Sequence, residues 1–286
     1  MIKRESDITL KLMTLCYAVI SLIVLNSCAH TFASLDYDES SVEDGSRFYV
    51  KLDKNLIQLE MLNELVETFE LDEIETEELP ERVAFLTFDD GPSTSTDRLL
   101  DVLADEGVPA IFFLLGYSIN SFPDSEVLME RMLDQGHYIG LHTMTHEYHT
   151  LYVGDGAPDR FIAEKFELQG LIYDLVAHHT NLCRAAYGKM TGFRPRHFIA
   201  VDEAGIKCID WNIDPEDWRN DAQGIYEEVV RQVEDLYFPS ELVIVFHEFE
   251  QTIEAMPAII AFLREHGYVF KTYEPGYEFI YYQYRR

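Results

Sequence analysis

A repeating alternation of short apolar runs with amphipathic stretches dominates the chain from Val83 onward. Several of the amphipathic stretches close on a glycine, namely Gly107, Gly136, Gly205 and Gly267. Glycine just past a helix readily adopts the left-handed conformation that ends the helix. Gly205 and Gly267 stand directly before an apolar run, and Gly107 and Gly136 stand two or three residues before one. The pattern therefore predicts helices that each lead into the next strand.

The apolar runs are the expected strands. They cover residues 83–87, 110–115, 138–142, 182–187, 206–211, 242–247 and 268–273. Strands that are apolar along nearly their whole length are typical of a parallel sheet covered by helices. An open doubly wound sheet and a closed barrel both fit this pattern, and the spacing does not separate them. In either architecture, functional groups are expected at the carboxyl ends of the strands.

Ionisable and aromatic polar residues do gather at these strand ends. Asp89 and Asp90 follow the first strand, His142 ends the third, Arg184 and Tyr187 lie in the fourth, Asp217 and Trp218 follow the fifth, and His247 ends the sixth. Folding alone does not require such residues at one edge from five separate strands. The distribution therefore predicts a functional site at that edge.

Two of these segments predict a metal site. The adjacent carboxylates of Asp89 and Asp90 repel each other unless a cation, an arginine or hydrogen bonds offset the repulsion. His142 and His146 are four residues apart and can converge on one cation if the chain turns between them. Histidines with one carboxylate, and coordination positions left open, form a ligand set typical of catalytic metals. Considered separately, the first segment could be an acidic turn and the second a histidine-rich loop.

Five segments, in order, resemble the motifs of the polysaccharide deacetylases with a NodB homology domain, which form carbohydrate esterase family four. Residues 87–92 resemble the TFDDGP motif, 142–146 the H(S/T)xxH motif, 184–188 the RPPYG motif, 214–218 the DxxDW motif, and 243–247 the final apolar strand with its histidine. The resemblance extends from about residue 82 to residue 274. It implies an α/β fold, a distorted seven-stranded (β/α) barrel related to the TIM barrel.

The resemblance also implies the site chemistry. Asp90, His142 and His146 would hold a divalent ion, usually zinc. Asp89 would be the general base and Arg184 would hold its carboxylate in place.

The remaining roles that the resemblance implies concern the substrate and the leaving group. The backbone N–H of Tyr187 would help to stabilise the oxyanion. His247 would protonate the departing amine, with Asp217 holding its ring. Trp218 and Val245 would line a small pocket for the acetyl methyl group.

The third motif departs from the family pattern, because Ala185 and Ala186 replace the usual prolines. The loop that carries the Tyr187 N–H is therefore expected to be less rigid or to present a different surface. A second Arg-Pro pair, Arg194-Pro195, is rejected as this motif, because only the earlier position leaves room for a helix and a strand before Trp211.

The N-terminal residues predict export. Lys3, Arg4 and Lys11 precede an uncharged run over 12–25, which is the pattern of a secretory signal. That run is shorter than the ~20 residues that a membrane span needs. The run leads into Cys28, in a sequence that resembles a bacterial lipobox. Cleavage after residue 33 and an uncleaved anchor are the alternatives. We expect a signal over 1–28, an acidic linker with an amphipathic helix over 29–80, and the deacetylase domain over 81–286.

Composition limits the partners. The 22 basic and 52 acidic residues give a net charge of −30, which argues against nucleic-acid binding. The resemblance implies an acetylated polysaccharide as the partner. We expect membrane contact only through the N-terminal signal or a lipid anchor, and we expect the chain to be monomeric.

Of the four cysteines, Cys183 and Cys208 fall on neighbouring predicted strands, where two buried thiols are favoured over a disulfide.

These features together predict an exported, metal-dependent deacetylase of N-acetylglucosamine units, with peptidoglycan as the first candidate substrate. A poly-N-acetylglucosamine exopolysaccharide, chitin and acetylated xylan remain alternatives. A non-catalytic, glycan-binding envelope lipoprotein is a further alternative from a different class. A metal-scavenging protein is disfavoured, because metal binding alone requires neither Arg184 nor the pair of Asp217 and His247.

Overall fold

The computed structural model describes residues 81–280. The predicted export signal, the lipobox at Cys28, the acidic linker and the amphipathic helix all lie outside the described residues. Between residues 81 and 280, no helix is long and apolar enough to span a lipid bilayer.

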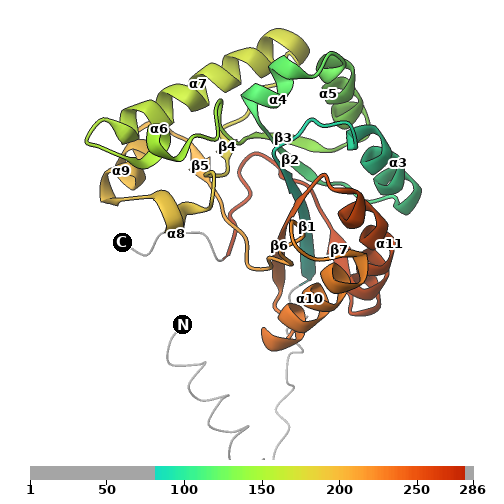
Figure 1. The fold of residues 1–286 in the computed structure, drawn as a ribbon. Helices are drawn as coiled ribbons and strands as arrows, with labels where there is room; N and C mark the ends of the chain where they lie inside the picture. The colour runs from blue at the N-terminus through green and yellow to red at the C-terminus, as the bar shows by residue number, and fades with distance from the viewer. Residues whose placement is uncertain (1–80, 281–286) are drawn as a thin grey trace, which may run out of the picture. The chain divides into compact units, whose positions relative to one another are not determined.

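Seven parallel strands form one sheet (Figure 1). They are β1 (Arg82–Asp89), β2 (Ile111–Leu114), β3 (Tyr138–Leu141), β4 (Leu182–Cys183), β5 (Lys207–Cys208), β6 (Glu241–His247) and β7 (Tyr268–Phe270). The order is β5-β4-β3-β2-β1-β6, and β7 pairs with the first half of β1 while β2 pairs with the second half. A bridge from Ile213 to Ile244 links the segment after β5 to β6. The predicted distorted barrel is confirmed.

Helices cover the outer side of the sheet in Figure 1. They are α3 (Thr96–Glu106), α4 (Gly116–Ser121), α5 (Ser125–Asp134), α6 (Tyr148–Tyr152), α7 (Ala157–Val176), α8 (Lys189–Gly192), α9 (Pro195–Glu203), α10 (Ala222–Asp235) and α11 (Glu250–Glu265). The glycines predicted to end helices have positive φ angles, from 63° at Gly107 to 80° at Gly136. Left-handed glycine therefore does end these helices ahead of the strands, as the sequence predicted.

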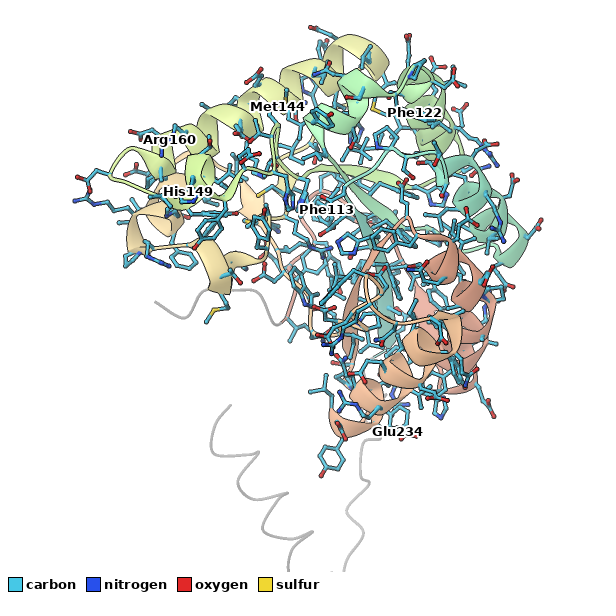
Figure 2. The ribbon with its side chains drawn as sticks, viewed as in Figure 1. Phe113, Phe122, Met144, His149, Arg160 and Glu234 are labelled. Carbon is cyan, nitrogen blue, oxygen red and sulfur yellow. The ribbon has the colours of Figure 1, made fainter. Side chains whose placement is uncertain are left out.

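The two faces of the strands contribute to two apolar clusters. Along β1, Leu86 and Phe88 point to the helices and join the larger cluster. Phe85 points inward and joins a smaller cluster with Phe113, which is labelled in Figure 2. Since successive side chains of a strand alternate between faces, Asp89 points to the same inner side as Phe85. The pleat of β1 therefore directs this carboxylate toward the interior of the barrel.

Strands β4 and β5 are much shorter than predicted, and the expected strands over 182–187 and 206–211 were wrong in length. The partner strand β3 ends at Leu141, and Arg184 N–H donates the last ladder bond, to the Leu141 carbonyl. Beyond Arg184 the chain has no neighbouring strand to pair with. The residues after β4 are thereby released to form the loop that carries Tyr187.

Cys183 and Cys208 are register partners on β4 and β5, and both are buried free thiols. Their free state agrees with the expectation from the sequence.

Candidate active site

The site begins at the carboxyl ends of β1 and β6. Asp89 and His247 are register partners on these neighbouring strands, and both end on the inner face of the barrel. Thr87 and Val245 form the preceding inward pair of the same ladder. Parallel pairing in this register therefore brings a carboxylate and an imidazole side by side.

Arg184 fixes Asp89. Its guanidinium is fully buried, and Nη1 donates to Asp89 Oδ1 at 2.9 Å and to Thr87 Oγ1 at 2.6 Å. Nη2 donates to the Asp210 carbonyl at 3.1 Å, and the guanidinium carbon lies 4.4 Å from the centre of the Phe113 ring. A charge-assisted pair in a buried setting orients the carboxylate more strictly than solvent would. The structure thus brings Asp89 and Arg184 together, as the sequence predicted.

Asp90, His142 and His146 form one cluster. The Oδ1 atom of Asp90 lies 3.2 Å from His142 Nε2 and 3.6 Å from His146 Nε2, and the potential ligand atoms are all within 4.8 Å of one another. Both Asp90 and His146 have positive φ angles, 70° and 58°, which turn their side chains back toward this point. Among the described residues these three alone form such a group.

The donor set fits a divalent ion. Asp90 Oδ1 is buried and makes no hydrogen bond within residues 81–280, which fits an atom that can serve as a metal ligand. Burial alone would raise the pKa of Asp90, but the adjacent His142 and the charges of His146 and His247 lower it well below its ordinary value. Burial and His142 lower the pKa of His146. An ionised carboxylate and a neutral imidazole are the forms that bind metal.

His247 lies beside the cluster. Its Nδ1 lies 2.8 Å from Asp217 Oδ1, while Asp217 Oδ2 accepts hydrogen bonds from His247 N–H at 2.6 Å and from Thr252 Oγ1 at 2.8 Å. Burial would lower the pKa of His247, but the hydrogen bond and charge of Asp217, with Asp89 and Asp90, raise it to about 9. His247 Nε2 lies 3.8 Å from Asp90 Oδ2. The ring is therefore protonated near neutral pH and faces the cluster.

The three predicted substrate contacts lie around this cluster in different settings. The Tyr187 ring packs 4.5 Å from the His146 ring, and its hydroxyl donates to the His146 carbonyl at 3.0 Å. Trp218 follows Asp217 in the chain and is 61% exposed, whereas Val245 is buried on the inward face of β6. Tyr187 and Trp218 are therefore both exposed aromatic residues, whereas Val245 is not.

The segment with two alanines is held by side chains from the helices. Ala185 and Ala186 are fully buried. The Tyr152 hydroxyl donates to the Ala186 carbonyl at 2.7 Å, and Lys165 Nζ donates to the Arg184 carbonyl at 3.1 Å. These two bonds constrain the backbone where the family pattern would have prolines.

The histidine-rich stretch separates into different roles. His137 is buried, and its Nδ1 accepts a hydrogen bond from the Ala110 N–H at 3.0 Å. His149 is exposed on α6.

The second Arg-Pro pair lies away from this contact. Arg194-Pro195 begins α9, whereas it is Arg184 that donates to Asp89.

Several buried polar residues around the site were not found by sequence analysis. Thr87 lies within the first motif, but its contact with Arg184 was not expected. Glu164 and Lys165 of α7, and Glu248 after β6, gave no sequence signal. Glu248 lies beside the Asp90 turn, where its carboxylate accepts from Ser93 Oγ at 2.7 Å and from Thr96 Oγ1.

The carboxylate of Glu248 leaves little room for a side chain at position 91. A Cβ added to Gly91 would lie 2.1 Å from Oε1 of Glu248, whose other oxygen is tied to Ser93 and Thr96. Gly91→Ala is therefore expected to displace the adjacent Asp90 and to lower kcat/KM by about 10²-fold, the cost that a misplacement of about 1 Å can carry. Steady-state deacetylation kinetics would measure the loss.

Gly170→Ala is the matched control for this substitution. An added Cβ at Gly170, on α7, meets nothing within 4 Å. We expect it to keep wild-type kinetics and to stabilise the fold by about 0.5–1 kcal/mol, because alanine is favoured over glycine inside a helix. Wild-type kcat/KM in Gly91→Ala would contradict the packing argument.

The family model for polysaccharide deacetylase matches residues 76–207. A peptidoglycan-N-acetylglucosamine deacetylase of Bacillus cereus is 35% identical over 196 residues, which cover 67% of this chain and 69% of the relative. A chitooligosaccharide deacetylase of Sinorhizobium fredii is 29% identical over 206 residues, covering 66% of this chain and 88% of the relative.

The fold also matches solved structures. The crystal structure of a polysaccharide deacetylase from Bacillus cereus superposes with a TM-score of 0.62 and 36% identity, covering 69% of this chain and 95% of that one. On its sequence, its strand topology and these likenesses, the chain belongs to the polysaccharide deacetylase family, carbohydrate esterase family four, a family of hydrolases that act on the N-acetyl amide bond.

Proposed function

We propose that the protein removes acetyl groups from N-acetylglucosamine units of an extracytoplasmic glycan, with peptidoglycan as the preferred substrate and zinc as the bound ion. The likeness to the Bacillus cereus peptidoglycan-N-acetylglucosamine deacetylase supports this substrate. Two imidazoles and one carboxylate at an open site are ligands that suit zinc.

One observation carries the catalytic part of the proposal. A carboxylate bound to Arg184 and an imidazole bound to Asp217 both lie beside the candidate metal cluster. A protein that only bound metal or glycan would need neither pair. Acid–base hydrolysis needs both.

The proposed roles follow from the contacts. Asp90, His142 and His146 would hold the ion, which would supply Lewis-acid activation of the acetyl carbonyl and of water. Asp89 takes the proton of the attacking water. Arg184 holds the Asp89 carboxylate in a fixed orientation through Oδ1 and leaves the other oxygen for that proton. The C–N bond breaks as His247 gives a proton to the nitrogen, so that the glucosamine unit leaves as a neutral amine. The other product is acetic acid, which ionises to acetate by releasing its proton to solvent.

Substrate contacts are proposed for three residues. The backbone N–H of Tyr187 donates to the developing oxyanion, and Trp218 and Val245 line the space for the acetyl methyl group. The exposure of Trp218 supports contact with a sugar, since aromatic rings pack against the apolar face of pyranoses. A methyl-sized space would select acetyl over longer acyl groups.

The proposed cellular setting rests on the N-terminal sequence. We propose a signal over residues 1–28 with lipidation at Cys28, a linker with an amphipathic helix over 29–80, and a monomeric catalytic domain over 81–286 at the outer face of the membrane. The net charge of −30 suits a glycan partner better than nucleic acid. Radiolabelled palmitate incorporation that is lost in Cys28→Ala would test the anchor.

A second candidate substrate is a chitooligosaccharide or another β-linked N-acetylglucosamine polymer. The likeness to the Sinorhizobium fredii chitooligosaccharide deacetylase favours it over acetylated xylan. Acetate release should therefore be measured in parallel on peptidoglycan, chitin oligomers, poly-N-acetylglucosamine and acetylated xylan. Release that is fastest from peptidoglycan supports the proposal. Release from none of them by folded, zinc-loaded protein would favour a non-catalytic, glycan-binding role.

The pH dependence of the reaction should depend on Asp217. The pKa of His247 is raised to about 9 largely because of Asp217, so the protonated acid is present below that pH and is lost as the pH rises through it. Asp217→Asn lowers this pKa. We therefore expect the alkaline limb of the kcat/KM profile to move to lower pH by one or two units, about the effect of losing one close carboxylate.

The comparison needs a carboxylate that is remote from His247. Asp134→Asn, at the end of α5, serves as this control and should leave the alkaline limb in place. An alkaline limb that is unchanged in Asp217→Asn would remove His247 as the proton donor.

A further inference from the structure

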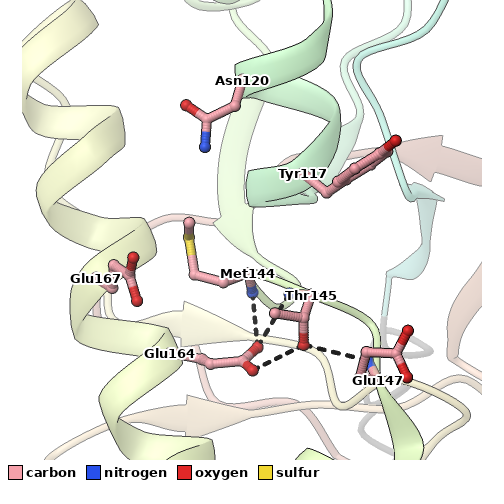
Figure 3. Close-up of a pocket in the computed structure, with 7 residues that line it drawn as sticks. All are labelled: Tyr117, Asn120, Met144, Thr145, Glu147, Glu164 and Glu167. Carbon is pink, nitrogen blue, oxygen red and sulfur yellow. Dashed lines mark hydrogen bonds between the residues drawn. The ribbon is translucent and has the colours of Figure 1, made fainter.

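Glu164 of α7 reaches from the outer layer of the fold to the loop between the two histidine ligands. Its Oε2 accepts from the backbone N–H of Met144 at 2.9 Å and of Thr145 at 3.1 Å, and its Oε1 accepts from Thr145 Oγ1 at 2.8 Å. Figure 3 shows these bonds beside a cavity of about 440 Å³. Glu164 itself is only 7% exposed.

The loop has few other partners for its amides. Within residues 144–147, the His146 N–H is bound by Thr143 Oγ1 at 2.8 Å, and the Glu147 N–H by Thr145 Oγ1 at 3.2 Å. Glu164 accepts the other two amides directly, and it also orients the Thr145 hydroxyl that binds Glu147. The Glu164 carboxylate thus binds two of these four consecutive N–H groups directly and orients the acceptor of a third.

This restraint matters because His146 is held in an unfavourable conformation. Its φ angle of 58° lies in the left-handed region, which a residue with a side chain adopts at a cost and keeps only where the surroundings fix it. That conformation turns the imidazole toward Asp90, to a distance of 3.6 Å. Without a fixed loop, His146 would spend less time in the position that binds an ion.

Helix α7 is a rigid base for the restraint. The helix buries Phe161, Leu168 and Ile172 on the side that packs against the domain. The neighbouring Lys165 is fully buried on the same helix and donates to the Arg184 carbonyl. A ligand held by groups on a packed helix keeps its geometry better than one held by a loop alone.

We infer that Glu164 is a positioning residue for the metal site. Its carboxylate pre-forms the 143–147 loop so that His146 joins Asp90 and His142 before an ion arrives, and its negative charge adds to the attraction for a cation. This inference rests on the metal site assigned under the proposed function. It extends that site to a residue that touches neither the ion nor the substrate.

A plainer reading is that Glu164 only attaches the loop to α7 and stabilises the fold. The two readings predict different measurements. A purely stabilising role lowers the melting temperature of the metal-free protein and leaves the dissociation constant for zinc unchanged. A positioning role raises that dissociation constant, because the free loop must be ordered when the ion binds. Water from the adjacent cavity can satisfy the released amides, so the fold is expected to survive the change.

The experiment measures zinc affinity of the full chain by competition with a chromophoric chelator, together with the melting temperature of the metal-free protein. Glu164→Ala removes all three hydrogen bonds and should raise the dissociation constant for zinc by about 10–100-fold, the usual effect of losing an outer partner of a ligand. Glu164→Gln keeps an acceptor but removes the charge, and should raise the constant by about 3–10-fold.

Glu167→Ala is the matched control, since Glu167 lies one turn along the same helix, lines the same cavity and is exposed. It should bind zinc as the wild type does. Dissociation constants within twofold of wild type for the Glu164 variants would overturn the inference, and Glu164→Gln decides alone if Glu164→Ala does not fold. If the wild type itself fails to bind zinc, the proposed metal site fails instead, so the two outcomes are distinct.

Discussion

Asp89→Asn is expected to reduce kcat by about 10²–10⁴-fold, the usual contribution of a general base, while zinc remains bound. The asparagine oxygen can still accept from Arg184, but its amide cannot take a proton from water. The three proposed ligands are not substituted, and the hydrogen bond that Asp89 makes is to Arg184 and not to any of them. Single-turnover acetate release and zinc content by mass spectrometry would measure both effects.

This substitution also leaves the buried Arg184 without a charged partner. Breaking a buried ion pair by removing one partner typically costs about 3–5 kcal/mol. The melting temperature should therefore be measured, and activity assayed well below it. Asp174→Asn, a change of the same kind on α7, should leave kcat unchanged. Turnover in Asp89→Asn near the wild-type rate would mean that another group takes the proton.

His142→Ala is expected to abolish tight zinc binding, and activity with it. His142 is 2% exposed, and its Nε2 lies 3.2 Å from Asp90 Oδ1, so the loss leaves two ligands out of three and a buried space. The dissociation constant for zinc should rise by more than the ~10–100-fold that loss of an outer partner costs. Calorimetric titration of zinc into the metal-free protein would measure this dissociation constant.

His149→Ala gives the control for a histidine lost from the same stretch of sequence. His149 is exposed on α6, and its removal should change neither zinc affinity nor turnover. An equal loss of zinc affinity in both variants would show that the loss is not specific to His142. Full zinc affinity in His142→Ala would place the ion elsewhere.

The sequence predicted the parts of the fold that local pattern determines. Helix ends at Gly107 and Gly136 depend on the conformational freedom of glycine, which is visible in one residue. The place of Asp89 at the carboxyl end of the first strand likewise follows from the apolar run before it. The lengths of β4 and β5 were not predictable, because they depend on where β3 ends and hence on pairing between distant segments.

The residues around the site likewise differ in whether the sequence could predict them. Asp90 and His146 could be identified from their motifs, whereas Glu164 lies 18 residues beyond His146 on a helix that reads as ordinary. On that helix Glu164 and Lys165 are buried while Phe166 is 56% exposed, the reverse of what hydrophobicity predicts. Their burial depends on the loop and the strand that pack against α7. Sequence periodicity carries no information about those partners.

Restoration of activity by added metal is the most direct test of metal-dependent deacetylation by this site. The protein would be stripped with a chelator, dialysed, and assayed for acetate release from peptidoglycan before and after one equivalent of zinc is added. We expect no release from the stripped protein, full release with zinc, and no release from zinc-loaded Asp89→Asn. Equal release with and without metal, or none from folded protein given zinc or cobalt, would contradict a metal-dependent deacetylase built on Asp90, His142 and His146.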